Sequence, residues 1–345
     1  MEKILVSPGM YLQGENILET CFEELLQYGK QGMFVTDTFV YQLIGEELIY
    51  RMTQNGCQLL VWLVDVGEQP DLPEEIEFIL ALGGGRAIDL GKSLALREKR
   101  ACVVIPTSAA TDAPVSRISV TYDKDGHFQK YDYFSKGPDL VFVDTAILVN
   151  SPAHFLAAGI ADGLSTFVEA RTVWENQGLN TLGGRPTLAA QALAEKCREI
   201  LLANGVAALQ ANKDKSVTPE FEAVVEANIL LSGMGFESGG LSIAHALHNA
   251  LTSRFGKEIK ASHGQIIAVT TLIHLKSESR TELSKYQTFF QKLSLPVTIK
   301  DLGLQLDDSE IENIVQLAFD KNDGIVRSKT TVTKKQLIEA IKAYK

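Results

Sequence analysis

The sequence predicts an α/β unit built on a parallel sheet, followed by an all-helical unit. Three observations lead to this prediction. Short β-branched runs alternate with helical patterns in the first part of the chain, and strand signals nearly vanish after Asn150. The length of 345 residues suits about two domains at roughly 100–200 residues each. We therefore expect one domain at residues 1–150 and a second at 151–345.

The first domain contains apolar runs with the length and composition of buried strands. Such runs separated by helices are typical of a parallel sheet that is covered on both faces. Residues 117–134 instead alternate polar and apolar side chains around Asp125-Gly126, which predicts an antiparallel hairpin with a tight turn. The expected strands are 33–37, 57–64, 77–85, 100–108 and 140–145, with helices at 15–29, 39–55 and 87–97.

The second domain has long helical patterns that are separated by glycine and proline. No internal repeat of fixed period is visible. The pattern therefore predicts a domain made of helices alone. The expected helices are 152–174, 185–212, 219–235, 238–253, 263–277, 280–293, 308–320 and 333–344.

Composition and charge exclude several classes of partner. The formal net charge is −10, from 33 basic and 43 acidic residues, which argues against binding to nucleic acid or to an anionic membrane surface. The apolar runs are too short to cross a bilayer, and the first residues lack the apolar core of a signal peptide. The four cysteines are widely separated, which favours reduced thiols. We expect a cytoplasmic protein without a nucleic-acid or membrane partner.

A glycine turn is the first candidate binding site. The strand at 77–85 ends in Gly83-Gly84-Gly85, and the pattern of a helix begins directly after it with Arg86 and Asp89. Glycines let the backbone approach a phosphate closely, and a helix N-terminus offers free N–H groups to it. The alternative is a tight strand-to-helix turn that binds nothing.

Two further candidates follow predicted strands of the same sheet. Asp37 ends the strand at 33–37, where an acid can bind the ribose of a dinucleotide and repel a 2′-phosphate; the alternative is a cap or turn residue. Thr107, Ser108 and Asp112 lie in a loop rich in small and hydroxyl residues after the strand at 100–108. Ligands of open α/β sheets bind at this edge, although an ordinary polar loop would look the same.

A cluster of histidines marks a candidate metal site in the helical domain. The chain has six histidines, and three of them, His245, His248 and His263, lie close together in the sequence. Asp162 lies in an apolar helical pattern. Imidazoles with one carboxylate are typical ligands of a divalent transition metal, and a site with three protein ligands keeps a position open for catalysis. The alternative is a set of structural histidines.

Three long segments resemble the glycerol dehydrogenase-like family, which includes the iron-containing alcohol dehydrogenases. They are TSAATDAPVSRISVTYDKDGHF, PDLVFVDTAILVNSPAHFLAAGIADGLSTFVEAR and VVEANILLSGMGFESGGLSIAHALHNALT, and the resemblance covers nearly the whole chain. It implies an N-terminal dinucleotide-binding domain, a helical C-terminal domain and an active site between them. It also implies that Asp162, His245 and His263 hold one divalent metal, zinc or, in some relatives, iron.

The resemblance further assigns the remaining site residues. It implies that Asp112 binds a substrate hydroxyl and that His248 lies beside the metal as a relay for protons. The expected NAD contacts are Asp37, Gly84, Gly85, Arg86, Asp89, Thr107 and Ser108, with Ser116, Ile118 and Tyr122 on the nicotinamide side. We also expect a homo-oligomer.

The expected activity is hydride transfer between a secondary hydroxyl of a small polyol, such as glycerol, and NAD. The sequence departs from the family where Arg86 replaces a usual lysine, where Ala250 replaces a glycine, and after His263, where a Glu-Lys pair is common. Two alternatives stay open. One is a reductase of a 2-oxo acid or a polyol phosphate on the same fold, and the other is a relative that binds metal or nucleotide without catalysis.

Overall fold

The computed structural model describes residues 2–321 and 323–345. The side chains of Tyr122, Lys321 and Asp323 lie outside the described part.

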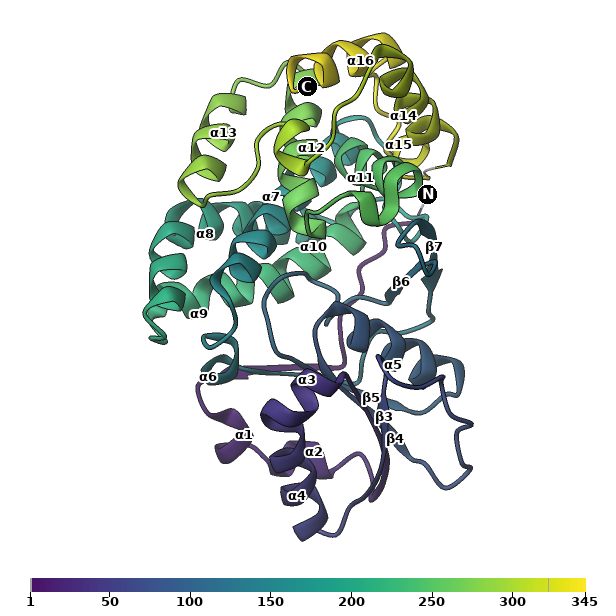
Figure 1. Cartoon of the computed structure of the whole chain (residues 1–345), viewed down its shortest axis with the longest axis vertical. Coiled ribbons are helices and arrows are strands. Elements are labelled where there is room, and N and C mark those ends of the chain that lie inside the picture. Colours follow the sequence, from purple (N-terminus) through teal and green to yellow (C-terminus); the bar gives the residue numbers. More distant parts are fainter. Residues whose placement is uncertain (1, 322) are drawn as a thin grey trace.

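A parallel sheet forms the centre of the N-terminal part (Figure 1). In the described residues it has six strands in the order β1-β8-β5-β4-β2-β3, and every pairing between them is parallel. The predicted parallel sheet is therefore confirmed. Its strands are β1 (Met10–Gly14), β2 (Gln31–Thr36), β3 (Gln58–Leu63), β4 (Phe78–Gly83), β5 (Ala101–Pro106) and β8 (Leu140–Asp144).

Sequence reasoning missed β1, an edge strand whose residues are all exposed or half-exposed. It lacks the apolar run that marks a central strand of a covered sheet.

Helices cover both faces of this sheet, as predicted. Neighbouring residues of one strand point to opposite faces, so Phe34 packs into one apolar core and Val35 into another. The Phe34 core is shared with α1 (Ile17–Thr20), α2 (Glu23–Leu26) and α4 (Glu46–Gln54), and the Val35 core with α5 (Gly85–Arg97). Before α4, the chain forms α3 (Thr38–Val40) and the π-helical η1 (Tyr41–Gly45).

The single helix expected at 15–29 is wrong, because two short helices stand there. The chain turns at Cys21, so that Ile17 of α1 and Leu25 of α2 both reach the same core.

The predicted hairpin is confirmed and reaches toward the helical part. It consists of β6 (Ile118–Tyr122) and β7 (Phe128–Tyr133), which pair antiparallel. Gly126 has φ +80° in its turn, a conformation that glycine adopts without strain. Ser253 donates a hydrogen bond to the Phe128 carbonyl, so the hairpin is attached to the helices (Figure 1).

The rest of the chain is helical, which confirms the predicted class of fold. The boundary between the two domains at residue 150 stays a prediction. Its elements are α6 (Thr145–Leu148), α7 (Ala153–Glu175), α8 (Leu188–Lys213), α9 (Pro219–Glu226), η2 (Ala227–Leu231), α10 (Ser232–Gly239), α11 (Ile243–Phe255), η3 (Gly256–Glu258), α12 (His263–Ser277), α13 (Leu283–Lys292), η4 (Lys300–Leu302), α14 (Asp308–Lys321), α15 (Asp323–Ser328) and α16 (Lys334–Ala343). Sequence reasoning missed α6 and α15. The helix predicted at 238–253 begins only at Ile243, because α10 continues to Gly239 and Gly240 ends it.

Helix α7 lies at the centre of the helical part. Its residues from Leu156 to Ala170 are all buried, as expected for a helix that is apolar or small on every face. The same core includes Val141 and Val143 of β8, so the sheet and the helices are packed together. Polar side chains in the middle of α7 are therefore held in a buried, fixed environment.

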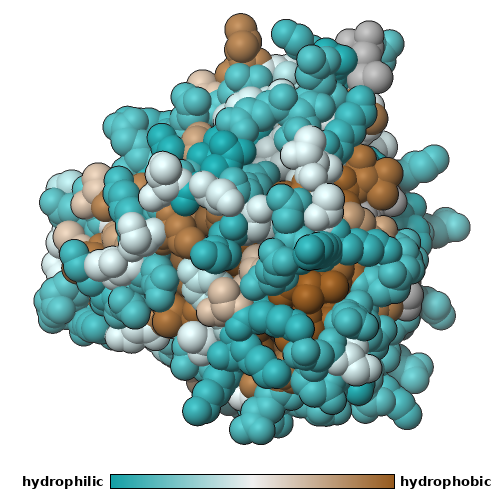
Figure 2. Space-filling view, turned by 90° about the horizontal axis from the view of Figure 1, so that it is seen from above, coloured by the Kyte–Doolittle hydropathy of each residue, from teal (hydrophilic) through white to brown (hydrophobic). Residues whose placement is uncertain are grey.

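The outer surface is mostly polar. Seen from above, the molecule shows hydrophilic side chains with apolar ones exposed in the recesses between them (Figure 2). Among the described residues, no helix is both long enough and apolar enough to span a membrane.

Candidate functional site

The structure brings Asp162, His245 and His263 together from three separate helices. Asp162 lies in the middle of α7, His245 in the first turn of α11, and His263 is the first residue of α12. Oδ1 of Asp162 is 3.6 Å from Nε2 of His245 and 3.2 Å from Nε2 of His263. One ligand atom from each residue lies within 4.8 Å of the others. This spacing allows one ion to contact all three.

Close packing of α12 against α7 places His263. A Cβ added to Gly264 would lie 2.1 Å from the carbonyl oxygen of Ala158 on α7. Only glycine therefore permits this approach of the two backbones. At the same end of α12, the Gln265 side chain accepts a hydrogen bond from the backbone N–H of Ser262, which caps the helix.

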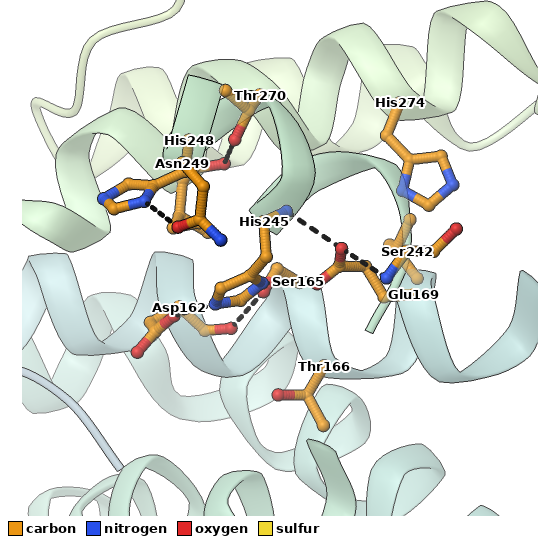
Figure 3. Close-up of polar contacts among 12 residues, drawn as sticks. Asp162, Ser165, Thr166, Glu169, Ser242, His245, His248, Asn249, Thr270 and His274 are labelled. Carbon is orange, nitrogen blue, oxygen red and sulfur yellow. Dashed lines mark hydrogen bonds and ion pairs between the residues drawn. The ribbon is translucent and has the colours of Figure 1, made fainter. Parts of the chain in front are cut away.

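Glu169 orients His245. It lies two helical turns beyond Asp162 on α7, and its Oε2 is 2.5 Å from Nδ1 of His245. Its other oxygen accepts the backbone N–H groups of Ser242 and His245, each at 2.9 Å, as Figure 3 shows. With Nδ1–H held by this carboxylate, Nε2 of His245 faces Asp162, and it can give its lone pair to an ion once it has lost its proton.

His248 joins the cluster from the next turn of α11. Its Nε2 is 2.9 Å from Nδ1 of His263, and its Nδ1 is 3.1 Å from Oδ1 of Asn249. The amide of Asn249 in turn donates to the hydroxyl of Tyr131 on β7, at 2.8 Å. A chain of hydrogen bonds thus connects His263 with the hairpin.

Burial and close charges shift the pKa values of this cluster. Burial lowers the pKa of His245, but the Glu169 and Asp162 carboxylates outweigh it and raise the pKa to about 10. Burial raises the pKa of Asp162, but His263 and His245 hold it well below its usual range. Burial, together with the nearby His263, keeps the pKa of His248 well below its usual range. Hence Asp162 is a carboxylate and His248 is neutral.

The loop after β5 carries Asp112 to the same region. Its Oδ2 accepts a hydrogen bond of 2.6 Å from the hydroxyl of Ser232, the first residue of α10. Burial, and then the negative charge of Asp162, raise the pKa of Asp112 to about 8. A divalent cation bound by Asp162 would offset that second cause.

A buried lysine holds the segment that follows Asp112. Lys92 of α5 is fully buried, and its ammonium donates to the carbonyls of Ala113 and Ile118, each at 2.6 Å. It also contacts the Ser116 hydroxyl at 3.2 Å and Oδ1 of Asp89 at 3.2 Å. The helix that follows the glycine turn therefore fixes both the loop that carries Asp112 and the start of the hairpin.

The predicted nucleotide residues lie along one edge of the sheet. Asp37 follows β2, the glycine turn follows β4, and Thr107 and Ser108 follow β5, which are neighbours in the order β5-β4-β2. The chain order reverses between β2 and β4, and ligands of open sheets bind at such a point. Asp37 caps α3 through Val40 N–H, while its other oxygen lies 3.7 Å from the position of a Cβ built on Gly83.

The glycine turn has room for a ligand. Gly84 precedes α5 and Gly85 begins it, and a Cβ added to Gly84 meets no atom within 4 Å. The space beside Gly84, at the N-terminal end of α5, is therefore open, and the free N–H groups of a helix N-terminus can bind a pyrophosphate. The turn, the Asp37 carboxylate and the hydroxyls after β5 together fit a dinucleotide.

The other predicted nucleotide residues have partners within the protein. Arg86 donates to the Val64 carbonyl at 3.3 Å. The Asp89 carboxylate accepts from the Val120 N–H and contacts Lys92, so it supports the hairpin. Ser116 and Ile118 are buried, and the predicted contact at Tyr122 falls on a side chain outside the described residues.

A pocket of about 250 Å³ reaches His245 from the side of the hairpin. Its walls come from β7, α11, α15 and the segment at 179–181, and they include Tyr131, Asn249 and Arg327. The pocket gives a small molecule access to His245.

Sequence reasoning missed Glu169, Lys92 and Ser232. Glu169 left a signal, since an acid two turns from Asp162 on an apolar helix must face the same side. Lys92 also left one, as a charged residue one turn after Asp89. Ser232 left none, because its partner lies 120 positions away.

The site fits a divalent metal, since one carboxylate and two oriented imidazoles converge there.

Comparison with known proteins agrees with a metal-dependent enzyme. Residues 8–145 match the family model described as iron-containing alcohol dehydrogenase. The chain is 36% identical to a glycerol dehydrogenase of Thermotoga maritima, covering 98% of this chain and 95% of the relative. It is 34% identical to a glycolaldehyde reductase of Halobacterium salinarum, covering 99% and 96%.

The solved structure of glycerol dehydrogenase from Schizosaccharomyces pombe has a TM-score of 0.93 to this chain, at 30% identity, and covers 99% of this chain and 90% of that one. The chain therefore belongs to the iron-containing alcohol dehydrogenase family. The expected class of enzyme, an NAD-linked and metal-dependent alcohol oxidoreductase, is thereby confirmed.

Proposed function

We propose that the protein oxidises a secondary hydroxyl of a small vicinal diol, glycerol or a close analogue, and reduces NAD⁺. The observation that carries this proposal is the position of Asp112. Its half-buried carboxyl group is bonded to Ser232, whose hydroxyl contacts Thr166 one turn after Asp162 on α7. The charges of Asp162 and His245 also shift its pKa. A diol offers two neighbouring hydroxyls, one for the metal site and one for this carboxylate.

Asp162, His245 and His263 are the residues that would hold the metal, with zinc as the expected ion and iron as the alternative. When bound, the ion supplies Lewis-acid polarisation of the reacting hydroxyl, and NAD⁺ accepts the hydride. Glu169 keeps Nε2 of His245 directed at the site. His248 is the proposed relay for the proton, because its neutral imidazole lies 2.9 Å from His263 and can accept a proton there, while Asn249 holds its other nitrogen.

We place NAD across the carboxyl edge of the sheet. Asp37 would accept hydrogen bonds from the adenosine ribose, and Gly84 and Gly85 would receive the pyrophosphate. Thr107 and Ser108 would contact the cofactor beside them. Ser116, Ile118 and Tyr122 belong to the segment proposed for the nicotinamide side. Arg86 and Asp89 would act through the turn and the hairpin, since their side chains have protein partners.

A reductase of 2-oxo acids or polyol phosphates is the competing function. An anionic substrate would place its charge beside the acidic Asp112 side chain, whose ionisation it would oppose, whereas a neutral diol can hydrogen-bond to Asp112 without that cost. The relative named glycolaldehyde reductase carries a name for reduction of a small hydroxylated carbonyl compound. This chemistry is compatible with a diol site working in reverse.

The deciding experiment uses metal-stripped protein to which zinc or iron(II) is added in separate samples. NADH absorbance is then followed with NAD⁺ and glycerol, 1,2-propanediol, 2-propanol, a 2-hydroxy acid or a polyol phosphate. We expect turnover with the two diols and much less with 2-propanol. Preference for the acid or the phosphate would favour the competing function. Metal and NAD binding without turnover on any of the substrates would identify a non-catalytic relative.

The four cysteines are free, and Cys57, Cys102 and Cys197 are buried. Reduced thiols support the proposal of a cytoplasmic protein. A homo-oligomer, which the family resemblance implies, can be tested by light scattering of the purified protein.

A further inference from the structure

Three polar side chains from distant parts of the chain form a hydrogen-bonded series next to the proposed metal ligands. The Ser232 hydroxyl is 2.6 Å from Oδ2 of Asp112 and 2.9 Å from the hydroxyl of Thr166. Ser232 and Thr166 are 0% and 1% exposed, so water does not compete for the bond between their hydroxyls, whereas Asp112 is half-buried. Thr166 lies one turn after Asp162 on α7 (Figure 3), which ties the series to the helix that carries a proposed metal ligand.

The chemistry of the groups sets the direction of the series. The Ser232 hydroxyl donates to Asp112, and in the ionised form of Asp112 this is the only possible direction, because a carboxylate can only accept hydrogen bonds. The oxygen of Ser232 then accepts the proton of the Thr166 hydroxyl. Each hydroxyl therefore has one defined orientation, and Thr166 directs Ser232 as Ser232 directs Asp112.

Other contacts hold the backbone around Asp112. Lys92 binds the Ala113 carbonyl from α5. On the opposite side, a Cβ added to Gly233 would lie 2.0 Å from Cγ2 of Val115 and 3.1 Å from the Asp112 carbonyl oxygen. The loop is thus pressed against α10. Loss of the Ser232 hydroxyl would leave this backbone in place and release only the rotation of the Asp112 side chain.

The two oxygens of Asp112 differ in their surroundings. Oδ2 is occupied by Ser232, whereas no described residue donates a hydrogen bond to Oδ1. Fixing Oδ2 therefore determines where Oδ1 points. Under the proposed function, on which this inference rests, Oδ1 is the atom that meets the second hydroxyl of a diol.

We propose that Ser232, directed by Thr166, is a positioning residue that makes the enzyme select diols over mono-alcohols. It acts through Asp112 and does not touch the substrate. A misdirected carboxylate weakens binding of the second hydroxyl only, so a mono-alcohol is insensitive to it. The measured quantity is the ratio of kcat/KM for 1,2-propanediol to that for 2-propanol.

The test compares Ser232→Ala with Ser238→Ala in the zinc-loaded enzyme. Ser238 is the matched control, because it is buried on the same helix and its hydroxyl accepts from the N–H of Val6. We expect Ser232→Ala to lower the ratio roughly tenfold, which is the size of one hydrogen bond to a charged group, and Ser238→Ala to leave it unchanged. Calorimetric titration of glycerol into the NADH complex should show the same loss of affinity for Ser232→Ala.

Thr166 provides a second pair of variants if Ser232→Ala fails to fold. Thr166→Val removes the hydroxyl with little change of shape and should lower the ratio, whereas Thr166→Ser retains the hydroxyl and should restore it. Equal losses on both substrates, in the Ser232 variant or in the Thr166→Val variant, would mean a purely structural role and overturn the inference.

Asp112→Ala separates this inference from the proposed function. If Asp112→Ala strongly lowers the ratio of the two kcat/KM values but Ser232→Ala and Thr166→Val do not, the positioning role of Ser232 is wrong. Recognition of the diol by Asp112 is then still supported. If the unmodified enzyme shows no preference for the diol, or if Asp112→Ala leaves the ratio unchanged, the proposed function itself is wrong.

Discussion

Glu169 of α7 and His245 of α11 form a buried pair in which Oε2 and Nδ1 are 2.5 Å apart. The same carboxylate also accepts the backbone N–H groups of Ser242 and His245. Glu169 therefore fixes both the ring of His245 and the end of the helix that carries it. A metal ligand with a fixed ring loses less freedom on binding the ion.

Replacement of Glu169 with Gln should weaken metal binding. The amide keeps the size of the side chain but removes the charge that orients and polarises His245. Loss of such a partner typically costs about 10- to 100-fold in metal affinity. Competition with a chromogenic zinc chelator measures this directly, and Glu175→Gln, on an exposed part of the same helix, serves as the control. Unchanged zinc affinity in Glu169→Gln would remove Glu169 from the metal site.

His263→Ala should abolish both metal retention and turnover. Two of the three proposed ligands remain, and the open side of the site becomes too large to hold one ion in a fixed geometry. NAD binding, followed by nucleotide fluorescence, should persist, because the sheet edge is untouched. His154→Ala, an exposed histidine near the start of α7, should behave as wild type. Full activity with one zinc per chain in His263→Ala would contradict the assignment.

Asp37→Ser should narrow the preference for NAD⁺ over NADP⁺. Serine can still cap α3, as Asp37 does through Val40 N–H, so the fold is expected to persist. The substitution removes the charge that repels a 2′-phosphate and the charge-assisted bond to the ribose. Together these losses should reduce the ratio of kcat/KM for NAD⁺ to that for NADP⁺ by about tenfold or more. The two cofactors are compared under the same conditions. A wild-type enzyme that uses both equally well would refute this role of Asp37.

Lys92→Met should destabilise the protein strongly. The change removes the cationic partner of Asp89 and the ammonium that donates to the carbonyls of Ala113 and Ile118 at 2.6 Å. Those two carbonyls then keep only the longer bonds of 3.3 Å from the Ser116 hydroxyl. Breaking a buried ion pair from one side costs about 3–5 kcal/mol, measured as the free energy of unfolding in urea. Arg97→Met, at an exposed position of the same helix, should change it by less than about 0.5 kcal/mol. A similarly small effect for Lys92→Met would mean that the bonds of the Lys92 ammonium contribute little to the stability of the protein.

Glu278 should contribute stability that disappears in acid. Burial raises its pKa, but His274, Thr172 and Arg280 outweigh this and lower it to about 2, against an ordinary value of 4.5. The carboxylate is then stabilising above about pH 4.5, and its contribution is lost as the pH falls toward 2.

Unfolding in urea at a series of pH values tests this expectation. Wild type should exceed Glu278→Gln in stability near pH 6, and the difference should shrink as the pH approaches 3. Glu199→Gln, on an exposed face of α8, is the control and should show no such trend. A difference between wild type and Glu278→Gln that stays constant with pH would mean that the ionised form of Glu278 is not favoured by folding.

Patterns local in the sequence predicted most of the architecture. Apolar runs located β2, β4, β5 and β8, and the alternation around Asp125-Gly126 located the hairpin. The short elements were not predicted. Strand β1 has no apolar run, and α6 and α15 have only four and six residues. Such elements form because neighbouring parts of the fold pack against them, and a local pattern does not record that.

For the candidate site, the sequence by itself determined which residue types are present and on which elements they stand. Local patterns pointed to the glycine turn, to the strand-end Asp37 and to a cluster of Asp162 with three histidines. The family resemblance then selected Asp162, His245 and His263 as the expected donor set. Only the tertiary structure decided how these groups are held. Glu169 meets His245, Lys92 meets Ala113, and Ser232 meets Asp112 because separate elements pack side by side. A single hydrogen bond between residues so distant in the chain depends on ångström-scale distances in the folded core, and periodicity and composition carry no information about them.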